Sequence, residues 1–288
     1  MDLVLTCITL NVKLDDDFVQ SMAAIAALQD TTVAGMDIEA GMARFILETT
    51  RDAQSLRNAL QETMDRYAID MILQPYPQPR YKLLISDMDS TMITCECIDE
   101  LADFVGKKQQ VSSITARAMN GELDFDAALT ERVALLAGLD EAALEQCFLE
   151  RVKPMPGAGA LLAAHKAAGG YSVLVSGGFT FFTGRVARAL GFDEHHGNRL
   201  EISGGKLTGR IIPPILGKDA KLQTLHDSCQ KLGISSEEVL AIGDGANDLP
   251  MLLAAGLGVA YHAKPAVRAQ ARAYINHSDL SAIKWLVN

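Results

Sequence analysis

Three apolar runs in the second part of the chain each end in polar or glycine-rich sequence. The runs KLLIS, YSVLV and EVLAI end at Asp87, at residues 176–178 (SGG) and at residues 243–245 (GDG). Segments with helical spacing lie between them, and GLGVAY (256–261) is a further run of this kind. Short continuous apolar strands that alternate with helices predict a parallel sheet covered on both faces. Because such sheets bind ligands beyond the carboxyl ends of their strands, we expect the three polar endings to meet in one crevice.

Residues 97–150 interrupt this alternation. They contain several segments of helical character and no convincing strand, which predicts a helical cap inserted over the crevice. RLEISGGKLTGRI (199–211) predicts a hairpin with a Ser-Gly-Gly turn. The fold expected for residues 81–288 is therefore an α/β, Rossmann-like parallel sheet with an inserted cap at about 97–150.

The first 73 residues predict a separate, smaller α+β domain. Their pattern is strand, helix, strand, strand, helix, strand, with a hairpin around Gly41, which is the ferredoxin-like order. Residues 74–80, QPYPQPR, hold three prolines and predict an extended linker at the domain boundary. Because so small a domain buries a limited core, we expect it to pack against the larger domain or against a second subunit in a homodimer.

Composition and charge indicate which kinds of partner the protein can bind. The 288 residues are 49% hydrophobic and carry a net charge of −10, which favours a globular protein and argues against a nucleic-acid binder. No apolar run reaches the roughly 18 residues of a membrane helix. The five cysteines are scattered and odd in number, so we expect no disulfide framework and a cytoplasmic location. A small molecule is the expected partner.

Asp87 and Asp89 stand two residues apart, directly after the first strand of this sheet. Two carboxylates this close repel each other unless a cation compensates them, and Mg²⁺ prefers such oxygen ligands. DMDST alone is a weak signal, but SGG, GKDAKL and GDGAND follow it in order at strand or helix ends. Together these segments resemble the haloacid-dehalogenase superfamily of phosphotransferases. IDELA, MNGELDF, ERVALL and GKLTG extend the resemblance over residues 81–288.

The resemblance implies Mg²⁺-dependent hydrolysis of O-phospho-L-serine to L-serine and phosphate, the last step of serine biosynthesis. Asp87 would be the nucleophile that forms an aspartyl-phosphate, and Asp89 the general acid and base. The metal ligands would be the carboxylates of Asp87 and Asp244 and the main-chain carbonyl of Asp89. Asp248 would bind a metal-bound water or Lys221.

The resemblance also assigns the phosphate contacts. Ser176 and the N–H groups of Gly177 and Gly178 would donate hydrogen bonds to the phosphoryl oxygens. GKDAKL contains two lysines, and the spacing to the third strand resembles the family best if Lys221 is the active-site lysine. Lys218 is the alternative, with a solvated surface position as its expected place.

Substrate choice is expected to come from the cap. Glu96 would bind the ammonium of the amino acid, and Arg132 would bind its carboxylate with a bidentate fork. Met119 and Phe125 would wall the pocket and exclude water. Asn247 would assist from the core side.

Other functions remain open at this point. The same residues would serve a phosphotransferase that passes the phosphoryl group to an alcohol such as homoserine, or a phosphatase of another small phosphomonoester. A third alternative is a non-catalytic sensor that binds an amino acid through residues 1–73. These residues resemble the regulatory modules called ACT domains. Their first strand-to-helix loop, NVKLDDD (11–17), lacks the glycine found in many amino-acid-binding members, so we expect a dimerisation or docking role.

Overall fold

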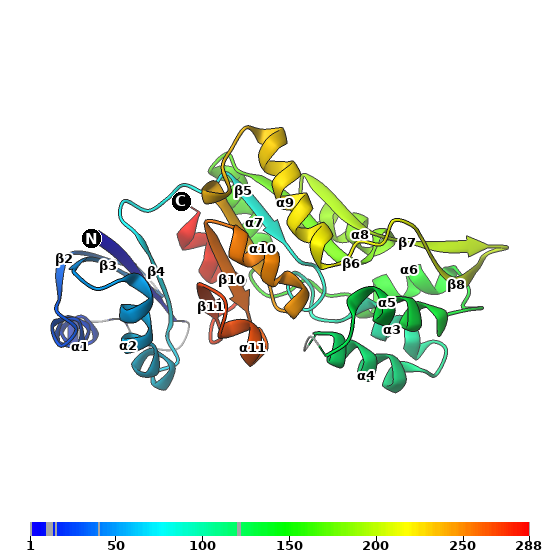
Figure 1. Ribbon diagram of the computed structural model, residues 1–288, viewed down its shortest axis with the longest axis horizontal. Helices are drawn as coiled ribbons and strands as arrows, with labels where there is room; N and C mark the ends of the chain where they lie inside the picture. Colours follow the sequence, from blue (N-terminus) through cyan, green and yellow to red (C-terminus); the bar gives the residue numbers. More distant parts are fainter. Residues whose placement is uncertain (1, 10–13, 15, 40, 120–121, 288) are drawn as a thin grey trace.

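Two separate β-sheets organise the chain (Figure 1). The computed structural model describes residues 2–9, 14, 16–39, 41–119 and 122–287. The first strand-to-helix loop, residues 11–17, whose lack of glycine argued against amino-acid binding, therefore lies largely outside the described residues. The side chains of Met119 and Lys218 also lie outside them.

The first sheet and its two helices follow the predicted order. These elements are β1 (Asp2–Ile8), α1 (Asp16–Ala27), β2 (Thr31–Glu39), β3 (Met42–Thr49), α2 (Ala53–Arg66) and β4 (Asp70–Pro75). The strands are antiparallel in the order β2-β3-β1-β4. Gly41 lies in the predicted hairpin between β2 and β3 with a φ of 83°, a value that glycine adopts at little cost. Leu3 and Leu5 of β1 pack with Leu56 and Leu60 of α2 in a core of their own.

The opposite face of this sheet contacts the C-terminal end of the chain. Ile8 and Ile72 belong to the same buried cluster as Ile283. The buried carboxylate of Asp70 accepts hydrogen bonds from the main-chain N–H groups of residues 276–278, at 2.7 to 3.2 Å. The small sheet is therefore anchored to the larger unit by apolar packing and by a satisfied buried charge, in addition to the linker.

The second sheet contains the strands that the sequence predicted, with one addition. Its strands are β5 (Leu83–Ser86), β6 (Tyr171–Phe179), β7 (Glu194–Ser203), β8 (Lys206–Ile212), β9 (Val239–Gly243), β10 (Leu257–Tyr261) and β11 (Ala273–Ile275). Their order is β11-β10-β9-β5-β6-β7-β8, and all neighbours are parallel except the hairpin pair β7 and β8. The sequence analysis did not predict β11, because three residues are too short for a periodic pattern.

Helices cover both faces of this sheet, as expected for a parallel sheet. They are α7 (Ala158–Ala167), α8 (Thr180–Leu190), α9 (Lys218–Leu232), α10 (Leu249–Ala254) and α11 (Pro265–Arg268), with 3₁₀ turns at Ser236–Glu238, Ala246–Asp248 and Leu280–Leu286. Leu84 of β5 faces one buried cluster, and its neighbours Leu83 and Ile85 face the other. β5 is therefore a central strand with apolar packing on both sides.

Four helices occupy the segment predicted as a cap. They are α3 (Cys97–Asp103), α4 (Lys108–Met119), α5 (Phe125–Ala134) and α6 (Ala142–Arg151), and they lie together at one end of the molecule (Figure 1). The two chain segments that connect them to the core run side by side. Thr94 N–H donates to the carbonyl of Lys153, and Met155 N–H donates to that of Met92. These paired segments are the junction between cap and core.

None of the helices in the described part of the chain combines the length and apolar character that a bilayer-spanning segment requires. The five cysteines are all free thiols, and four of them are buried.

His165 of α7 is a buried imidazole with only one of its two nitrogens paired. Its Nε2 lies 2.9 Å from the carbonyl oxygen of Tyr171, so Nε2 carries the proton and donates. Its Nδ1 has no partner among the described residues. Burial lowers the pKa of His165, because protonation would place a second N–H in a site without an acceptor.

We expect this histidine to make stability fall in mild acid. With a lowered folded-state pKa, the stabilisation is complete above the unfolded pKa of about 6.5 and is lost as the pH falls through the folded value. His165→Gln keeps a donor to Tyr171 and removes the titration. Its free energy of unfolding in urea should therefore fall less steeply from pH 7 to pH 5, by up to about 1.4 kcal/mol per pH unit. Parallel curves for both proteins would contradict this assignment.

Candidate active site

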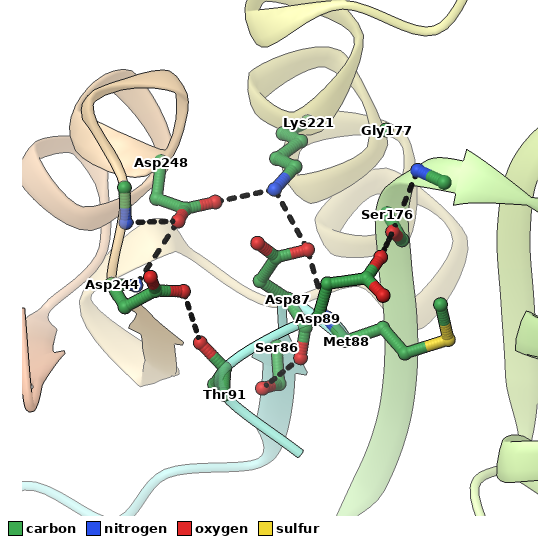
Figure 2. Close-up of polar contacts among 12 residues, drawn as sticks. Ser86, Asp87, Met88, Asp89, Thr91, Ser176, Gly177, Lys221, Asp244 and Asp248 are labelled. Carbon is green, nitrogen blue, oxygen red and sulfur yellow. Dashed lines mark hydrogen bonds and ion pairs between the residues drawn. The ribbon is translucent and has the colours of Figure 1, made fainter. Parts of the chain in front are cut away.

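The predicted crevice lies at the carboxyl edge of the larger sheet, where β9, β5 and β6 are neighbours. Asp87 and Asp89 follow β5, Asp244 follows β9, and residues 176–178 lie in the last part of β6. Lys221 comes from the first turn of α9. The side chains that the sequence analysis singled out converge from these elements (Figure 2).

Lys221 is a buried cation between two carboxylates. Its Nζ lies 2.8 Å from Oδ1 of Asp87 and 2.5 Å from Oδ1 of Asp248, and the residue is 1% exposed. The second oxygen of Asp248 accepts the N–H groups of Asp244 and Gly245, at 3.1 and 2.9 Å. Asp248 therefore holds both the lysine and the loop that carries Asp244 (Figure 2).

Asp87, Asp244 and Asp248 form a group of buried carboxylates whose ligand oxygens lie within 4.8 Å of one another. Among the described residues, Lys221 is the basic side chain that forms ion pairs with this group. Burial and the charge of Asp248 raise the pKa of Asp87 well above its usual range, although Lys221 opposes the shift. Burial and Asp248 also raise the pKa of Asp244 to about 7. Three carboxylates with one ammonium fit a site for a hard divalent cation, which would favour their ionised forms.

Asp89 has different surroundings from Asp87. Its Oδ1 accepts the main-chain N–H of Cys97 at 2.9 Å, and its Oδ2 accepts the hydroxyl of Ser176 at 3.2 Å. Burial raises the pKa of Asp89, whereas the hydrogen bonds from Cys97 and Ser176 oppose the shift. A raised pKa favours the protonated form that a proton donor needs. The carboxylate of Asp89 is not a member of the group of three; its expected metal ligand is the main-chain carbonyl.

The Ser-Gly-Gly segment lies inside the strand and not in a loop after it. β6 continues through Phe179, and its pairing with β7 shifts register between Val175 and Phe179. A Cβ on Gly177 would lie 2.4 Å from Cζ of Phe125, and one on Gly178 would lie 2.7 Å from a carboxylate oxygen of Asp89. The two glycines are required because the cap and the loop after β5 approach this strand closely, where its register shifts. The N–H of Gly178 donates to Oγ of Ser176 at 2.8 Å.

A small cavity lies between this edge of the sheet and the cap. The residues that line it come from both parts of the molecule: Asp87, Asp89, Glu96, Ile98, Thr115, Ala118, Phe125, Leu129, Arg132, Ser176, Gly177, Gly178, Phe179 and Asn247. Its free volume is about 50 Å³. This is well below the roughly 300 Å³ of typical pockets for drug-sized ligands, so the cap lies close to the core.

Glu96 and Arg132 place an acidic and a basic side chain on the cap side of this cavity. A carboxylate oxygen of Glu96 accepts the hydroxyl of Ser90. Burial and then the charge of Asp89 raise the pKa of Glu96 well above its usual range. Burial lowers the pKa of Arg132, although the charge of Glu96 opposes the shift. A ligand with one ammonium and one carboxylate would complement both side chains.

The structure brings together nearly all the predicted site residues. Asp87, Asp89, Glu96, Phe125, Arg132, Ser176, Gly177, Gly178 and Asn247 line the cavity, and Asp244, Asp248 and Lys221 lie beside it. Met119 and Lys218 cannot be placed, because their side chains lie outside the described residues.

The sequence analysis assigned no role to two hydroxyl groups of this site. Thr91 donates to Oδ1 of Asp244 at 2.8 Å and orients that carboxylate (Figure 2). Thr91 is the last residue of DMDST, and this position in the motif could have indicated a role in the site. Thr115 donates to Asp99 at 2.6 Å and accepts from Arg132. Nothing in the local sequence indicates this second contact, because it joins three different helices.

Comparison with known proteins agrees with the fold and the site. Residues 84–253, more than half of the chain, match the family of haloacid dehalogenase-like hydrolases. A phosphoserine phosphatase of Polaromonas sp. is 47% identical over 212 residues, which cover 72% of this chain and 90% of that protein.

Two solved structures extend the comparison to the three-dimensional fold. A HAD-family hydrolase from Salmonella enterica has a TM-score of 0.86 and 33% identity, covering 100% of this chain and 99% of the other. A phospho-aspartyl intermediate analogue of a phosphoserine phosphatase has a TM-score of 0.69 and 36% identity, covering 73% of this chain and 100% of that one.

Proposed function

Since the chain belongs to the haloacid dehalogenase-like hydrolase family, we propose that it hydrolyses O-phospho-L-serine to L-serine and inorganic phosphate. The relatives named phosphoserine phosphatase support this substrate. The observation that carries the proposal is the buried Asp87–Lys221 pair beside a cavity lined by Glu96 and Arg132. The pair suits attack on a phosphoryl group, and the two cap residues suit a free amino acid.

In the first step, a carboxylate oxygen of Asp87 attacks phosphorus and forms an oxygen–phosphorus bond. The bond between phosphorus and the serine oxygen breaks, and that oxygen takes the proton of Asp89. Lys221 lies 2.8 Å from Asp87 and offsets negative charge as the phosphoryl group arrives. The hydroxyl of Ser176 can turn from Asp89 to a phosphoryl oxygen, because a hydroxyl rotates freely.

In the second step, water attacks phosphorus of the aspartyl-phosphate. Asp89, now ionised, accepts the proton of that water, and the bond between Asp87 and phosphorus breaks to release phosphate. Asp89 ends the cycle protonated, so the proton balance closes. The separate hydrogen-bond partners of Asp87 and Asp89 allow the two carboxylates to hold different protonation states.

We propose Mg²⁺ as the cation of the carboxylate group. Asp87 and Asp244 would hold it, together with the main-chain carbonyl of Asp89. Bound Mg²⁺ would neutralise the charge of the transferring phosphoryl group. Both oxygens of Asp248 already accept hydrogen bonds, which suits a supporting role for this residue.

A substrate panel tests the reaction and the metal together. Phosphate release from L-phosphoserine is expected to stop in excess EDTA and to return with added Mg²⁺, because the carboxylate group then regains its cation. Release from phosphothreonine, from sugar phosphates and from O-phosphohomoserine should be slower at equal Mg²⁺. Addition of homoserine as an acceptor distinguishes a transferase, since phosphohomoserine would then form in place of free phosphate. Full activity in EDTA would contradict the metal assignment.

Arg132→Ala is expected to raise KM for phosphoserine by about 10²-fold. The variant removes a charged hydrogen-bonding partner of the substrate carboxylate, a contact worth roughly 2 to 3 kcal/mol. Because the contact forms before the chemical step, kcat should change much less than KM. Steady-state kinetics check both values, and an unchanged KM would remove Arg132 from substrate recognition.

We also propose the organisation into three parts: an ACT-like domain of residues 1–73, a linker of residues 74–80 and a phosphatase domain of residues 81–288 with its cap at about 97–150. The two sheets and the four cap helices support three parts, but β4 extends to Pro75, so Gln74 and Pro75 pair with β1 in the small sheet and the connecting segment begins after them. β2 is an edge strand with exposed Met36 and Ile38, which supports a second copy of the chain as the partner of the small domain.

A further inference from the structure

The guanidinium of Arg132 makes two hydrogen bonds within the cap. Its Nε donates to the carbonyl of Ala128 in its own helix at 3.2 Å, and its Nη1 donates to Oγ1 of Thr115 at 3.0 Å. A guanidinium carries five N–H groups in a rigid plane, so two fixed contacts set its orientation. The guanidinium makes no other hydrogen bond to the described residues, and Arg132 lines the cavity, so its other N–H groups can serve a ligand.

Thr115 is itself oriented by a buried carboxylate. Its Oγ1 lies 2.6 Å from Oδ1 of Asp99 and 3.1 Å from the carbonyl of Val111. The hydroxyl has one hydrogen, and the shorter contact, with the carboxyl oxygen of Asp99, is the stronger of the two. The hydrogen therefore points to Asp99, and a lone pair of the oxygen faces Arg132. Thr115 is 2% and Asp99 9% exposed, so water competes little for these contacts.

These three residues lie on three consecutive cap helices. Asp99 belongs to α3, Thr115 to α4 and Arg132 to α5. Asp99 also lies in the first turn of the helix that Glu96 precedes. The contacts therefore fix Arg132 relative to α3, which Glu96 directly precedes, and so fix the spacing between the two side chains that would meet the substrate.

We infer that Thr115, oriented by Asp99, is a positioning residue that aims the Arg132 guanidinium at the substrate carboxylate. It thereby sets the preference for phosphate esters of α-amino acids over phosphate esters without a carboxylate. The inference rests on the proposed function of Arg132. Thr115 acts only through Arg132, so its loss affects only substrates that carry the carboxylate.

The test compares phosphoserine with O-phosphoethanolamine, which keeps the ammonium and lacks the carboxylate. Thr115→Val has the same shape without the hydroxyl and is expected to raise KM for phosphoserine about tenfold at nearly constant kcat. The ratio kcat/KM for O-phosphoethanolamine should stay within about twofold of the wild type, because its binding does not use Arg132. Thr115→Ser restores the hydroxyl and should restore most of the lost preference.

The possible results distinguish failure of the inference about Thr115 from failure of the proposed function. If wild-type enzyme prefers phosphoserine and Thr115→Val keeps that preference, the inference is wrong and the proposed function stands. An equal loss on both substrates also overturns it, because it would indicate general damage to the cap. If the wild type hydrolyses both esters equally well, the inference fails together with the role of Arg132 in substrate recognition; if it does not hydrolyse phosphoserine at all, the proposed function fails. Should Thr115→Val not fold, Asp99→Asn keeps the size of the side chain and should reduce the preference by about two- to fivefold.

Discussion

Asp87→Asn is expected to reduce phosphoserine hydrolysis by about 10⁴-fold or more, the scale of losses that follow removal of a nucleophile. The amide has nearly the same shape as the carboxylate, but its oxygen is a poor nucleophile and forms no stable acyl-phosphate. The variant should remain folded, because it removes one negative charge from a group of three buried carboxylates. Release of inorganic phosphate under saturating substrate measures the loss, and circular dichroism checks the fold.

Asp227→Asn is the matched control for this experiment. Asp227 is an exposed residue of α9 that accepts a hydrogen bond from Gln223, and it lies outside the cavity. The control variant should hydrolyse phosphoserine at the wild-type rate. Activity of Asp87→Asn within tenfold of the wild type would show that another group attacks phosphorus. The assignment of Asp89 as acid and base would then lose its basis as well.

Lys221→Met is expected to lower both stability and activity. The variant keeps an unbranched side chain of similar length but leaves Asp87 and Asp248 buried without their ammonium partner. Loss of one partner from a buried ion pair typically costs about 3 to 5 kcal/mol in the free energy of unfolding. Hydrolysis should fall by about 10³-fold, because a preorganised charge at the phosphoryl group is also lost.

Urea unfolding with EDTA and with excess Mg²⁺ separates the two effects of this substitution. Mg²⁺ should stabilise Lys221→Met more than it stabilises the wild type, because the cation then replaces the missing positive charge. Lys231→Met on the same helix is the control: Lys231 is exposed and pairs with Glu194, and its loss should have only a small effect. Equal unfolding curves for Lys221→Met and the wild type in EDTA would contradict the importance of this buried pair.

The fold was largely predictable because its signals are local. Apolar runs, turn glycines and prolines indicated both hairpins, the alternation of β5 to β10 with helices, and the helical segment 97–150. The sequence did not predict the strand segments that form only by pairing with an adjacent strand. β11 is three residues long, and it forms a strand because it pairs with β10. Residues 176–178 look like a loop by composition, yet they continue β6 through a register shift against β7.

The amino-acid sequence by itself determined which chemical groups are present at the ends of β5, β6 and β9. It also determined that a parallel sheet would collect those groups at one edge, because strand periodicity and chain order are properties of the sequence. Only the tertiary structure decided how the groups pair: Asp248 with Lys221, Thr91 with Asp244, and Asp99 through Thr115 with Arg132. Each pair joins residues distant in the chain, and a hydrogen bond depends on distances of tenths of an ångström that packing sets.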